Sequence, residues 1–415
     1  MDTILVAAII FVFTYALISI RHLPKVNVNK GLAAAVGGIL MIVFGIVALT
    51  DVLDLINFDV IFLLLGMMML AAGLEFSGFF RIVSDFLVRF SGSKVRLLAY
   101  IMVISAVLSA MILNDAVVLI FTPIVIRCCR NTGCNPIPYL IGVMFSANIG
   151  SLATPIGNPQ NAYVASEAGI SFLEFSAHTF PISLVCLPVA FLIIYAIFRK
   201  NLTSDVCSHN DDEREVDRTR LWAVLIVTLG AFIGFAVSSF FDIPMYAIAM
   251  TAGILAIIVV MSKGLKNTVW VASRIDWSIL VFFIGLFVLM GGVSSSGLLD
   301  EFILLFPGFG EGETISIAGL AGFTAVLSNL VSNVPAVVLI SDMLPAGNIT
   351  LMITLVVSST LAGNATLIGS AANVIVSERS EEMGVSFSFW KFILIGLPVA
   401  MATLLIGVGM LMFMT

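Results

Sequence analysis

Apolar runs of about twenty residues recur along the whole chain, separated by short polar segments. A helix of that length crosses the roughly 30 Å hydrocarbon core of a bilayer. We therefore predict an all-α polytopic membrane protein with about ten spanning helices. The predicted spans are residues 3–20, 31–49, 60–76, 137–165, 180–198, 221–240, 244–262, 277–297, 349–376 and 392–413.

Two further apolar stretches are interrupted near their centres by polar residues. They cover residues 97–126 and 314–341, and the interruptions are Asn114-Asp115 and Ser332-Asn333. Irregular backbone survives at membrane depth only when it is buried in protein or lines a cavity. We interpret both stretches as re-entrant helical hairpins, which enter and leave the membrane by the same face.

The basic residues test this layout. All 19 Lys and Arg residues fall in loops that the predicted topology places on one face, and the charged residues in the opposite loops are all acidic. The positive-inside rule makes the basic face cytoplasmic. With an even number of crossings, both termini are expected outside, and the predicted location is the plasma (inner) membrane.

The composition excludes a chain dominated by soluble domains, because 60% of the residues are hydrophobic and only 11% are charged. The long polar stretch at residues 201–220 mixes both signs of charge, so we interpret it as a cytoplasmic linker between halves at 1–200 and 221–415. The five cysteines form no CxxC pair, and neither an HExxH motif nor a P-loop is present. We expect no enzyme activity, no cofactor and no nucleic-acid partner; because no P-loop is present, a primary pump would need an ATPase partner subunit.

Three motifs occur in both halves, in the same order: a hairpin tip, a broken span and a short amphipathic tail. The predicted topology gives the two copies opposite orientations, so we interpret the halves as inverted repeats. Secondary transporters use this architecture, with a binding site near the bilayer midplane where interrupted helices meet. The paired segments are LNDAVVLI (113–120) with SNVPAVVLI (332–340), TPIGNPQN (154–161) with TLIGSAAN (366–373), and AGISFLEF (168–175) with MGVSFSFW (383–390).

The four interruptions bring oxygen and amide groups to membrane depth. A helix that stops and restarts presents amide N–H groups at one end and carbonyls at the other, which suit an anion and a cation respectively. Glycine lets a ligand approach the backbone closely. We expect the interruptions to converge on a substrate and ion site. The candidates are Asn114, Asp115, Asn148, Gly150, Ser151, Thr154, Gly157, Asn158, Asn161, Ser332, Asn333, Asn364, Thr366, Gly369, Ser370 and Asn373.

Asp115 is the candidate coupling residue, because it is the acid predicted near the centre of a membrane-embedded segment. Burial raises the pKa of such a carboxyl and a bound cation lowers it, so the group can exchange H⁺ for another cation. The coupling ion is H⁺ or Na⁺, with a sodium site predicted at Asn114, Asp115, Ser332 and Asn333. The alternative is structural: these residues close turns, and Asp115 caps the helix that follows.

The chain resembles the ion transporter superfamily, in its arsenite-efflux permease and citrate-transporter-like (anion permease) branch. LNDAVVLIFTPIVI (113–126) is similar to the Asn-Asp hairpin of arsenite permeases, NIGSLATPIGNPQN (148–161) to the broken-helix motif of the superfamily, and SNLVSNVPAVVLI (328–340) to its second hairpin. The resemblance implies a homodimer. Each protomer would consist of a scaffold domain and a transport domain that moves in an elevator mechanism.

The predicted function is secondary active transport of a small anion or oxyacid, arsenite- or antimonite-like or carboxylate-like, coupled to H⁺ or Na⁺. A Na⁺/H⁺ antiporter, with Asp115 binding the transported cation, is the alternative. Sodium-coupled dicarboxylate or citrate uptake is less favoured, because that branch carries Ser-Asn-Thr at both hairpin tips. An intramembrane protease is disfavoured, because Asp115 has no second intramembrane aspartate.

Overall fold

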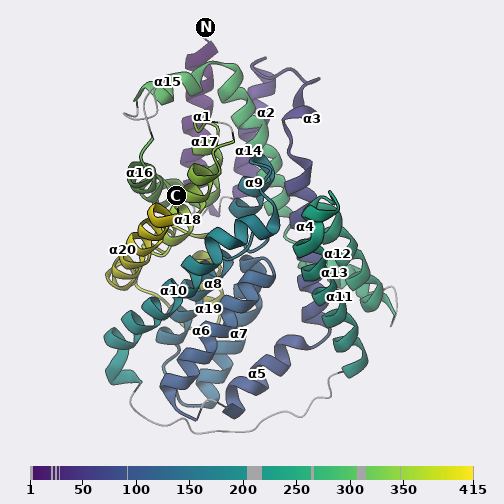
Figure 1. The fold of residues 1–415 in the computed structure, drawn as a ribbon, viewed down its shortest axis with the longest axis vertical. Helices are drawn as coiled ribbons and strands as arrows, with labels where there is room; N and C mark the ends of the chain where they lie inside the picture. The colour runs from purple at the N-terminus through teal and green to yellow at the C-terminus, as the bar shows by residue number, and fades with distance from the viewer. Residues whose placement is uncertain are drawn as a thin grey trace.

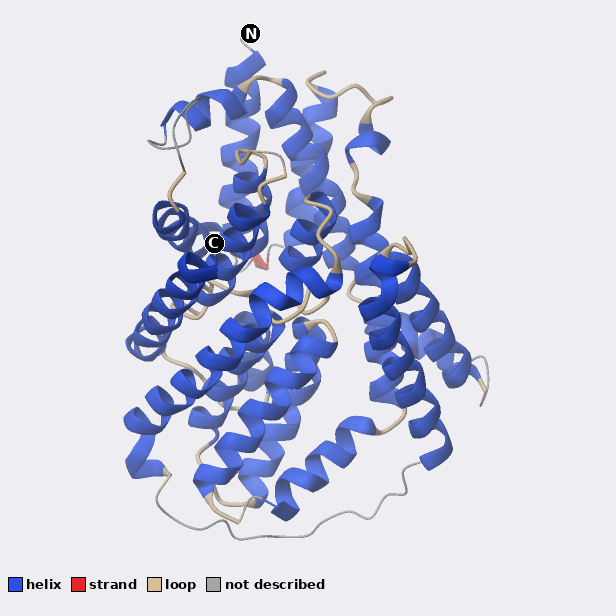
Figure 2. Ribbon diagram, in the orientation of Figure 1, coloured by secondary structure: helices blue, strands red, loops and turns tan. Residues whose placement is uncertain are grey.

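The computed structural model describes residues 3–19, 22–23, 26–27, 29–90, 92–202, 217–262, 266–305, 315–345 and 347–414. These residues are almost entirely helical (Figure 2). The exception to the predicted all-α fold is a two-stranded antiparallel pair, β1 (His22–Leu23) and β2 (Val26–Asn27), with His22 opposite Asn27.

The helices fall into two series along the chain. The first series is α1 (Thr3–Ser19), α2 (Lys30–Val43), α3 (Val52–Leu55), α4 (Phe58–Phe76), α5 (Phe79–Phe90), α6 (Lys94–Met111), α7 (Asn114–Asn131), α8 (Pro136–Ser151), α9 (Pro159–Glu167), α10 (Phe172–Phe198) and η1 (Arg199–Asn201). The second series is α11 (Arg218–Val237), η2 (Ser238–Phe240), α12 (Met245–Met261), α13 (Lys266–Arg274), α14 (Trp277–Ser295), α15 (Leu298–Leu305), α16 (Ile317–Val331), α17 (Asn333–Ser341), α18 (Ile349–Ala362), α19 (Ala371–Glu382) and α20 (Phe389–Met414).

Six helices of the described chain are long and apolar enough to cross a membrane: α4, α6, α10 with η1, α11 with η2, α14 and α20. Several predicted spans are shorter or broken. The predicted span 31–49 leaves helical geometry after Val43, where Gly45 turns the chain at a φ of +70°. The predicted spans 137–165 and 349–376 each contain two helices. Conversely, α6 was predicted as a hairpin arm but has the length of a span.

Two predicted boundaries need correction. The segments AGISFLEF and MGVSFSFW are not separate amphipathic tails, because they run into α10 and α20. Ser171 caps α10 by accepting a hydrogen bond from the Glu174 amide at 3.2 Å, and the helix continues for 27 residues. The short predicted tail is thus the start of a long helix.

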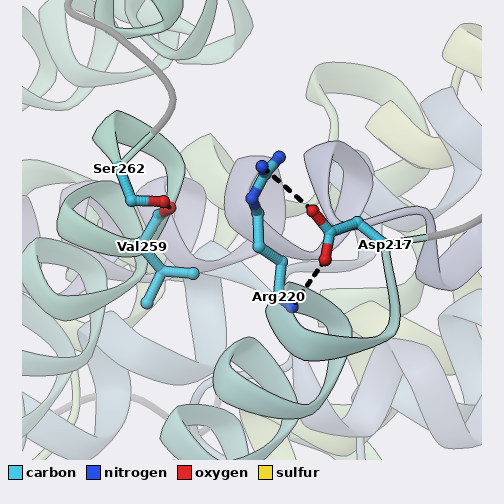
Figure 3. Close-up of polar contacts among 4 residues, drawn as sticks. All are labelled: Asp217, Arg220, Val259 and Ser262. Carbon is cyan, nitrogen blue, oxygen red and sulfur yellow. Dashed lines mark hydrogen bonds and ion pairs between the residues drawn. The ribbon is translucent and has the colours of Figure 1, made fainter.

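The predicted linker also ends earlier than expected, because α11 begins at Arg218. Asp217 caps this helix through the Arg220 amide at 3.3 Å, and its carboxylate pairs with the Arg220 guanidinium at 3.0 Å (Figure 3). The same guanidinium lies 5.7 Å from the centre of the Phe76 ring, so it joins α11 to α4. Residues 218–220 are therefore helical, and linker residues 203–216 lie outside the described residues.

Small residues bring two pairs of helices into close contact, α4 with α12 and α2 with α14. A Cβ added at Gly66 would lie within 3.0 Å of the Ala249 backbone, and one added at Gly285 within 3.0 Å of the Ala34 backbone. Small side chains at such crossings allow the backbones to approach closely. Seven residues further along α4 and α14, a Cβ added at Gly73 would lie 2.8 Å from the Ala256 side chain, and one added at Gly292 would lie 2.8 Å from the Met41 side chain.

The interrupted helices meet in the middle of the molecule. Figure 1 shows α8, α9, α17, α18 and α19 in this region, with α5 towards one end and the N-terminus and α15 at the other. α7 packs on α8 and α19, and α17 packs on α18 and α9. Each hairpin therefore contacts both broken helices.

We predict that Gly66→Val destabilises the fold. The added side chain collides with backbone atoms of α12, which cannot rotate away, and overpacking of this kind costs about 1–3 kcal/mol or more. The expected result is a lower midpoint of thermal unfolding in detergent. Gly230→Val in α11 is the matched control, because nothing lies within 4 Å of a Cβ added there. Equal midpoints for the two variants would contradict the prediction.

Candidate functional site

All four polar interruptions coincide with breaks between helices. α6 ends at Met111 and α7 begins at Asn114, while α16 and α17 are separated by Ser332 alone. Residues 152–158 separate α8 from α9, and residues 363–370 separate α18 from α19. The two longer breaks leave backbone carbonyls without the helical donors that would normally satisfy them.

Two asparagines bind the carbonyls freed at these breaks. The Asn161 amide donates to the carbonyls of Ser151 and Thr154, both at 2.9 Å. The Asn373 amide donates to the carbonyls of Gly363 and Thr366 at 2.9 and 3.1 Å. In both breaks the bound carbonyls lie ten and seven residues before the asparagine. The freed carbonyls of the two breaks are therefore satisfied by an asparagine side chain at the corresponding position.

Asn148 joins one break to the other. Its amide nitrogen donates to the side-chain oxygens of Asn364 and Asn373 at 2.9 and 3.1 Å. Its side-chain oxygen accepts from the Ser370 hydroxyl at 2.8 Å. All four side chains are buried. The candidates from the two halves thus form one hydrogen-bonded cluster.

The first hairpin tip is bonded to the first break. The Asn114 backbone N–H donates to the Gly157 carbonyl at 2.8 Å, and the Thr154 hydroxyl donates to the Ala110 carbonyl at 2.6 Å. A Cβ at Gly150 would lie within 3.0 Å of the Ala106 backbone, so only glycine fits there. The Asn158 side-chain oxygen caps α9 by accepting a hydrogen bond from the Asn161 backbone N–H at 3.0 Å.

The second hairpin tip is bonded to the second break. With its side-chain amide turned to match the surrounding carbonyls, Asn333 donates to the Gly369 carbonyl at 2.7 Å. Asn329, which the sequence interpretation did not select, accepts from the Thr366 hydroxyl at 3.0 Å and donates to the Ala362 carbonyl at 2.9 Å. Its position in SNLVSNVP, four residues before Asn333, is the signal that could have identified it.

Three buried polar atoms of this cluster have no hydrogen-bond partner within the described chain. They are the side-chain oxygens of Asn114 and Asn161 and the side-chain nitrogen of Asn364. Buried polar atoms are normally paired, so each orphan suggests an absent ligand or water. The first half offers two acceptors and the second half one donor.

A cavity of about 930 Å³ reaches the starts of α7, α9, α17 and α19, the four helices that begin at the interruptions and are called half-helices below. Its lining includes Asp115 near the start of α7, Pro159 at the start of α9, Ser332 before α17 and Ala371 at the start of α19. The N-termini of α7, α17 and α19 have no side-chain capping bond. Ser332 has a φ of +80°, a strained value for a non-glycine residue.

The candidates divide between the cavity and the cluster beside it. Asp115 and Ser332 line the cavity, whereas the asparagines of the breaks are not among its lining residues and bond to each other and to the backbone. A direct role for these asparagines in binding substrate remains a prediction. Their observed role is to hold the broken helices in place.

Further contacts join α17 and α9 to α1, α14 and the start of α4. The Tyr15 hydroxyl donates to the Pro335 carbonyl at 2.9 Å, which links α1 to α17. The Asn57 amide donates to the Ser166 hydroxyl at 3.2 Å, next to the start of α4. The Tyr163 ring lies 5.8 Å from the Phe287 ring of α14.

Asp342 follows α17 in this region and is a second titratable group of interest. The Ser341 hydroxyl donates to the Tyr163 hydroxyl at 3.1 Å, and Tyr163 donates to the Asp342 carboxylate at 3.4 Å. Burial and the neighbouring Glu167 carboxylate raise the pKa of Asp342 from its ordinary value of 3.8 to about 7. Asp342 therefore changes charge near neutral pH.

We predict that Asn161→Asp and Asn373→Asp each destabilise the protein. A carboxylate removes the two donors and faces two carbonyl oxygens, and leaving buried groups unpaired costs about 1–3 kcal/mol. Each variant should unfold at a lower temperature than the parent chain. Asn201→Asp, at an exposed position in η1, is the matched control. Unchanged melting of the two site variants would show that the breaks do not depend on these amides.

We predict that Asp342→Asn reduces the pH dependence of stability. The folded chain holds a proton on Asp342 up to about pH 7, whereas an unfolded chain releases it near pH 3.8. The resulting stabilisation is present at low pH and is lost as the pH rises through about 7. The protein surrounds much of the carboxyl group, but the residue keeps solvent-accessible surface, which reduces the effect. Melting temperatures of the parent and the variant between pH 5 and 8 test this; parallel curves would contradict it.

Comparison with known proteins identifies several similar chains. An uncharacterized transporter of Mycobacterium tuberculosis is 30% identical, with 97% of each chain covered. A silicon efflux transporter of Oryza sativa subsp. japonica is 26% identical, with 94% of this chain and 93% of the relative covered. The P protein of Homo sapiens is 26% identical, with 92% of this chain and 57% of the relative covered.

The fold is also similar to a solved structure. The crystal structure of the YdaH transporter of Alcanivorax borkumensis matches with a TM-score of 0.59 at 14% identity, covering 99% of this chain and 98% of that one. At this identity the match concerns the fold alone. A model of the citrate transporter family matches residues 9–350, which confirms the resemblance noted from the motifs. The chain is therefore a multi-pass membrane transporter rather than an enzyme, and it belongs to the citrate transporter family.

Proposed function

We propose that the chain is a secondary active transporter of a small anion or oxyacid, coupled to H⁺ or Na⁺. The observation that carries the proposal is the convergence of four half-helix starts on one cavity. The starts of α17 and α19 have no side-chain cap, so their amide N–H groups can bind the oxygen atoms of a ligand, whereas at α7 the Asn114 N–H already bonds the Gly157 carbonyl. The positive ends of the helix dipoles add to the attraction for an oxyanion.

The relatives support an oxygen-rich solute. The matching family is described as citrate transporters, and one relative is a silicon efflux transporter. Citrate, silicic acid and arsenite all present several oxygen atoms to amide donors, although they differ in charge. The donor atom left unpaired on Asn364 adds a further group for an oxygen ligand.

Asp115 is proposed to bind the coupling cation. It is buried, lies near the start of α7 and lines the cavity. The unpaired side-chain oxygens of Asn114 and Asn161 supply hard acceptors in the same half of the molecule. Na⁺ prefers such oxygen ligands, and a proton would bind the carboxylate itself. The predicted sodium site at Asn114, Asp115, Ser332 and Asn333 is retained within this proposal.

A Na⁺/H⁺ antiporter is the second candidate, because carboxylates outnumber cations on the cavity wall. Asp115, Asp276, Glu378, Glu381 and Glu382 line it, against Lys30. Such a wall attracts cations. In this alternative Asp115 binds the transported ion and no anion is carried.

We also propose that the halves at 1–200 and 221–415 are inverted repeats that allow alternating access. Support comes from the matched helix crossings of α4 with α12 and α2 with α14, and from the matched asparagines of the two breaks. The crossed helices would form the scaffold, and the hairpins and broken helices would move as the transport domain. A homodimer in the plasma membrane, with basic loops cytoplasmic and both termini outside, completes the proposal. An ATPase subunit would enter only if the chain served an arsenite pump.

Transport by purified protein in vesicles tests the proposal. Citrate, arsenite, silicic acid and Na⁺ are each offered under imposed pH and sodium gradients. We expect one oxygen-rich solute to move against its own gradient when the coupling gradient is present. Movement of Na⁺ against H⁺ alone would favour the antiporter and contradict anion or oxyacid transport.

We predict that Asp115→Asn reduces gradient-driven accumulation at least about 10-fold, because the neutral amide cannot bind H⁺ and holds Na⁺ weakly. Exchange of labelled for unlabelled solute, which needs no gradient, should be retained better than accumulation. Asp59→Asn, at an exposed position in the first turn of α4, is the control. Unchanged gradient dependence in Asp115→Asn would contradict its role in coupling.

A further inference from the structure

We propose that α19 separates two entrances of opposite charge, and that an anionic substrate uses the basic entrance while the coupling cation uses the acidic one. The proposal rests on the proposed function and deepens it, because it commits the substrate to an anion rather than a neutral oxyacid. It concerns the end of the molecule at which α7 and α19 finish.

The acidic entrance is the large cavity that reaches Asp115 and Ser332. One stripe of α19 forms part of its wall, with Ala371, Ile375 and Glu378 following at helical spacing. Glu381 and Asp276 add further carboxylates. The charged lining residues are Lys30, Asp115, Asp276, Glu378, Glu381 and Glu382, five acids against one base.

The basic entrance is a separate cavity of about 740 Å³, bounded by α4, α5, α7 and the other stripe of α19. Four arginines line it, whereas the acidic entrance has none. Its charged lining residues are Arg81, Arg127, Arg274 and Arg379 with Glu75, Asp85 and Glu382. The lining carries four positive against three negative charges, compared with one against five at the acidic entrance, so an anion is favoured here over the acidic entrance.

A small chamber of about 110 Å³ lies between the two entrances. It shares Glu75, Leu119, Ile120 and Arg274 with the basic entrance. It shares Asp115, Asp276, Ile279 and Ile375 with the acidic entrance. Both routes therefore adjoin the same chamber, and Asp115 stands at its wall. The starts of α17 and α19 line the acidic cavity alone, so an anion from the basic entrance reaches them by passing through this chamber.

Ion pairs within the basic entrance give an incoming anion partners to exchange with. Arg274 pairs with Glu75 at 3.1 Å, and Arg379 pairs with Glu382 at 2.8 Å. A substrate carboxylate can replace either glutamate, because guanidinium groups bind carboxylates with two parallel hydrogen bonds. Arg127 is exposed and makes no ion pair with the described residues, so its field acts on the entrance directly.

Separate entrances have a clear physical advantage. A wall of one sign concentrates the ion of the opposite sign and repels the other, so a single shared entrance would hinder one of the two ions. The attraction acts over about 8–10 Å at physiological ionic strength, and added salt weakens it. Arg379 lies on a face of α19 next to the acidic stripe, and Glu382 lines both cavities, so α19 forms the boundary between them.

The test compares two single-charge variants, Arg127→Gln in the basic entrance and Glu378→Gln in the acidic one. Both side chains are exposed, and neither is among the candidate site residues. We expect Arg127→Gln to raise the KM for citrate about 3- to 10-fold and to leave the KM for the coupling cation unchanged. Glu378→Gln should raise the KM for the coupling cation and leave the KM for citrate unchanged. Both increases in KM should be smaller in high salt. Lys391→Gln, which removes a charge outside both entrances, should change neither KM.

Binding of citrate to the detergent-solubilised protein, measured by calorimetry at several salt concentrations, provides a readout that does not need transport. Arg127→Gln should weaken this binding and flatten its salt dependence, and Glu378→Gln should not weaken it.

The two-entrance proposal would be overturned if both variants changed the KM for the same ion. It would also be overturned if Arg127→Gln left the affinity for citrate unchanged. Transport of silicic acid or arsenite but not citrate would overturn the commitment to an anion, while secondary transport itself would stand. Wild-type vesicles that bind citrate but carry no solute would contradict the proposed function instead.

Discussion

The structure depends on how the peptide groups freed at the two broken helices are satisfied. A carbonyl at membrane depth has no water to bond to, and leaving it unpaired is costly. Asn161 and Asn373 each donate two hydrogen bonds to such carbonyls. Because these amides hold the ends of α8 and α18, the chain can stop a helix inside the protein and start another without losing the fold.

The cavity is a consequence of these breaks. Once α9 and α19 begin inside the bundle, and the hairpin tips place the starts of α7 and α17 beside them, four helix N-termini face one space. Asn148 connects the two broken helices directly, so they are held as one unit. The side chains that look most like ligands therefore support the backbone of the breaks, and the amide groups of that backbone are the proposed binding groups.

The helices outside the hairpins and breaks are held together by close packing at glycines. α4 meets α12, and α2 meets α14, through glycines seven residues apart, which face alanines and, at Gly292, Met41; the backbones lie close and leave little room for adjustment. The hairpin and broken helices pack on these helices through the same hydrophobic core, and the Asn57 amide and the Phe287 ring add polar and ring contacts. This closely packed group is the scaffold of the proposed alternating access, and the hydrogen-bonded hairpins and broken helices are its proposed moving part.

The sequence by itself determined the membrane class, the positions of the four interruptions and the pairing of motifs between halves. These features follow from local composition, because prolines, glycines and asparagines within apolar runs are visible without a fold. It did not determine helix lengths, the role of Asn329 or the partition of charge by α19. The bond between Asn148 and Asn364 joins residues 216 positions apart, and Arg379 and Glu378 are neighbours in sequence that line different cavities. Only the tertiary structure decides such relations, because they depend on which helix faces which.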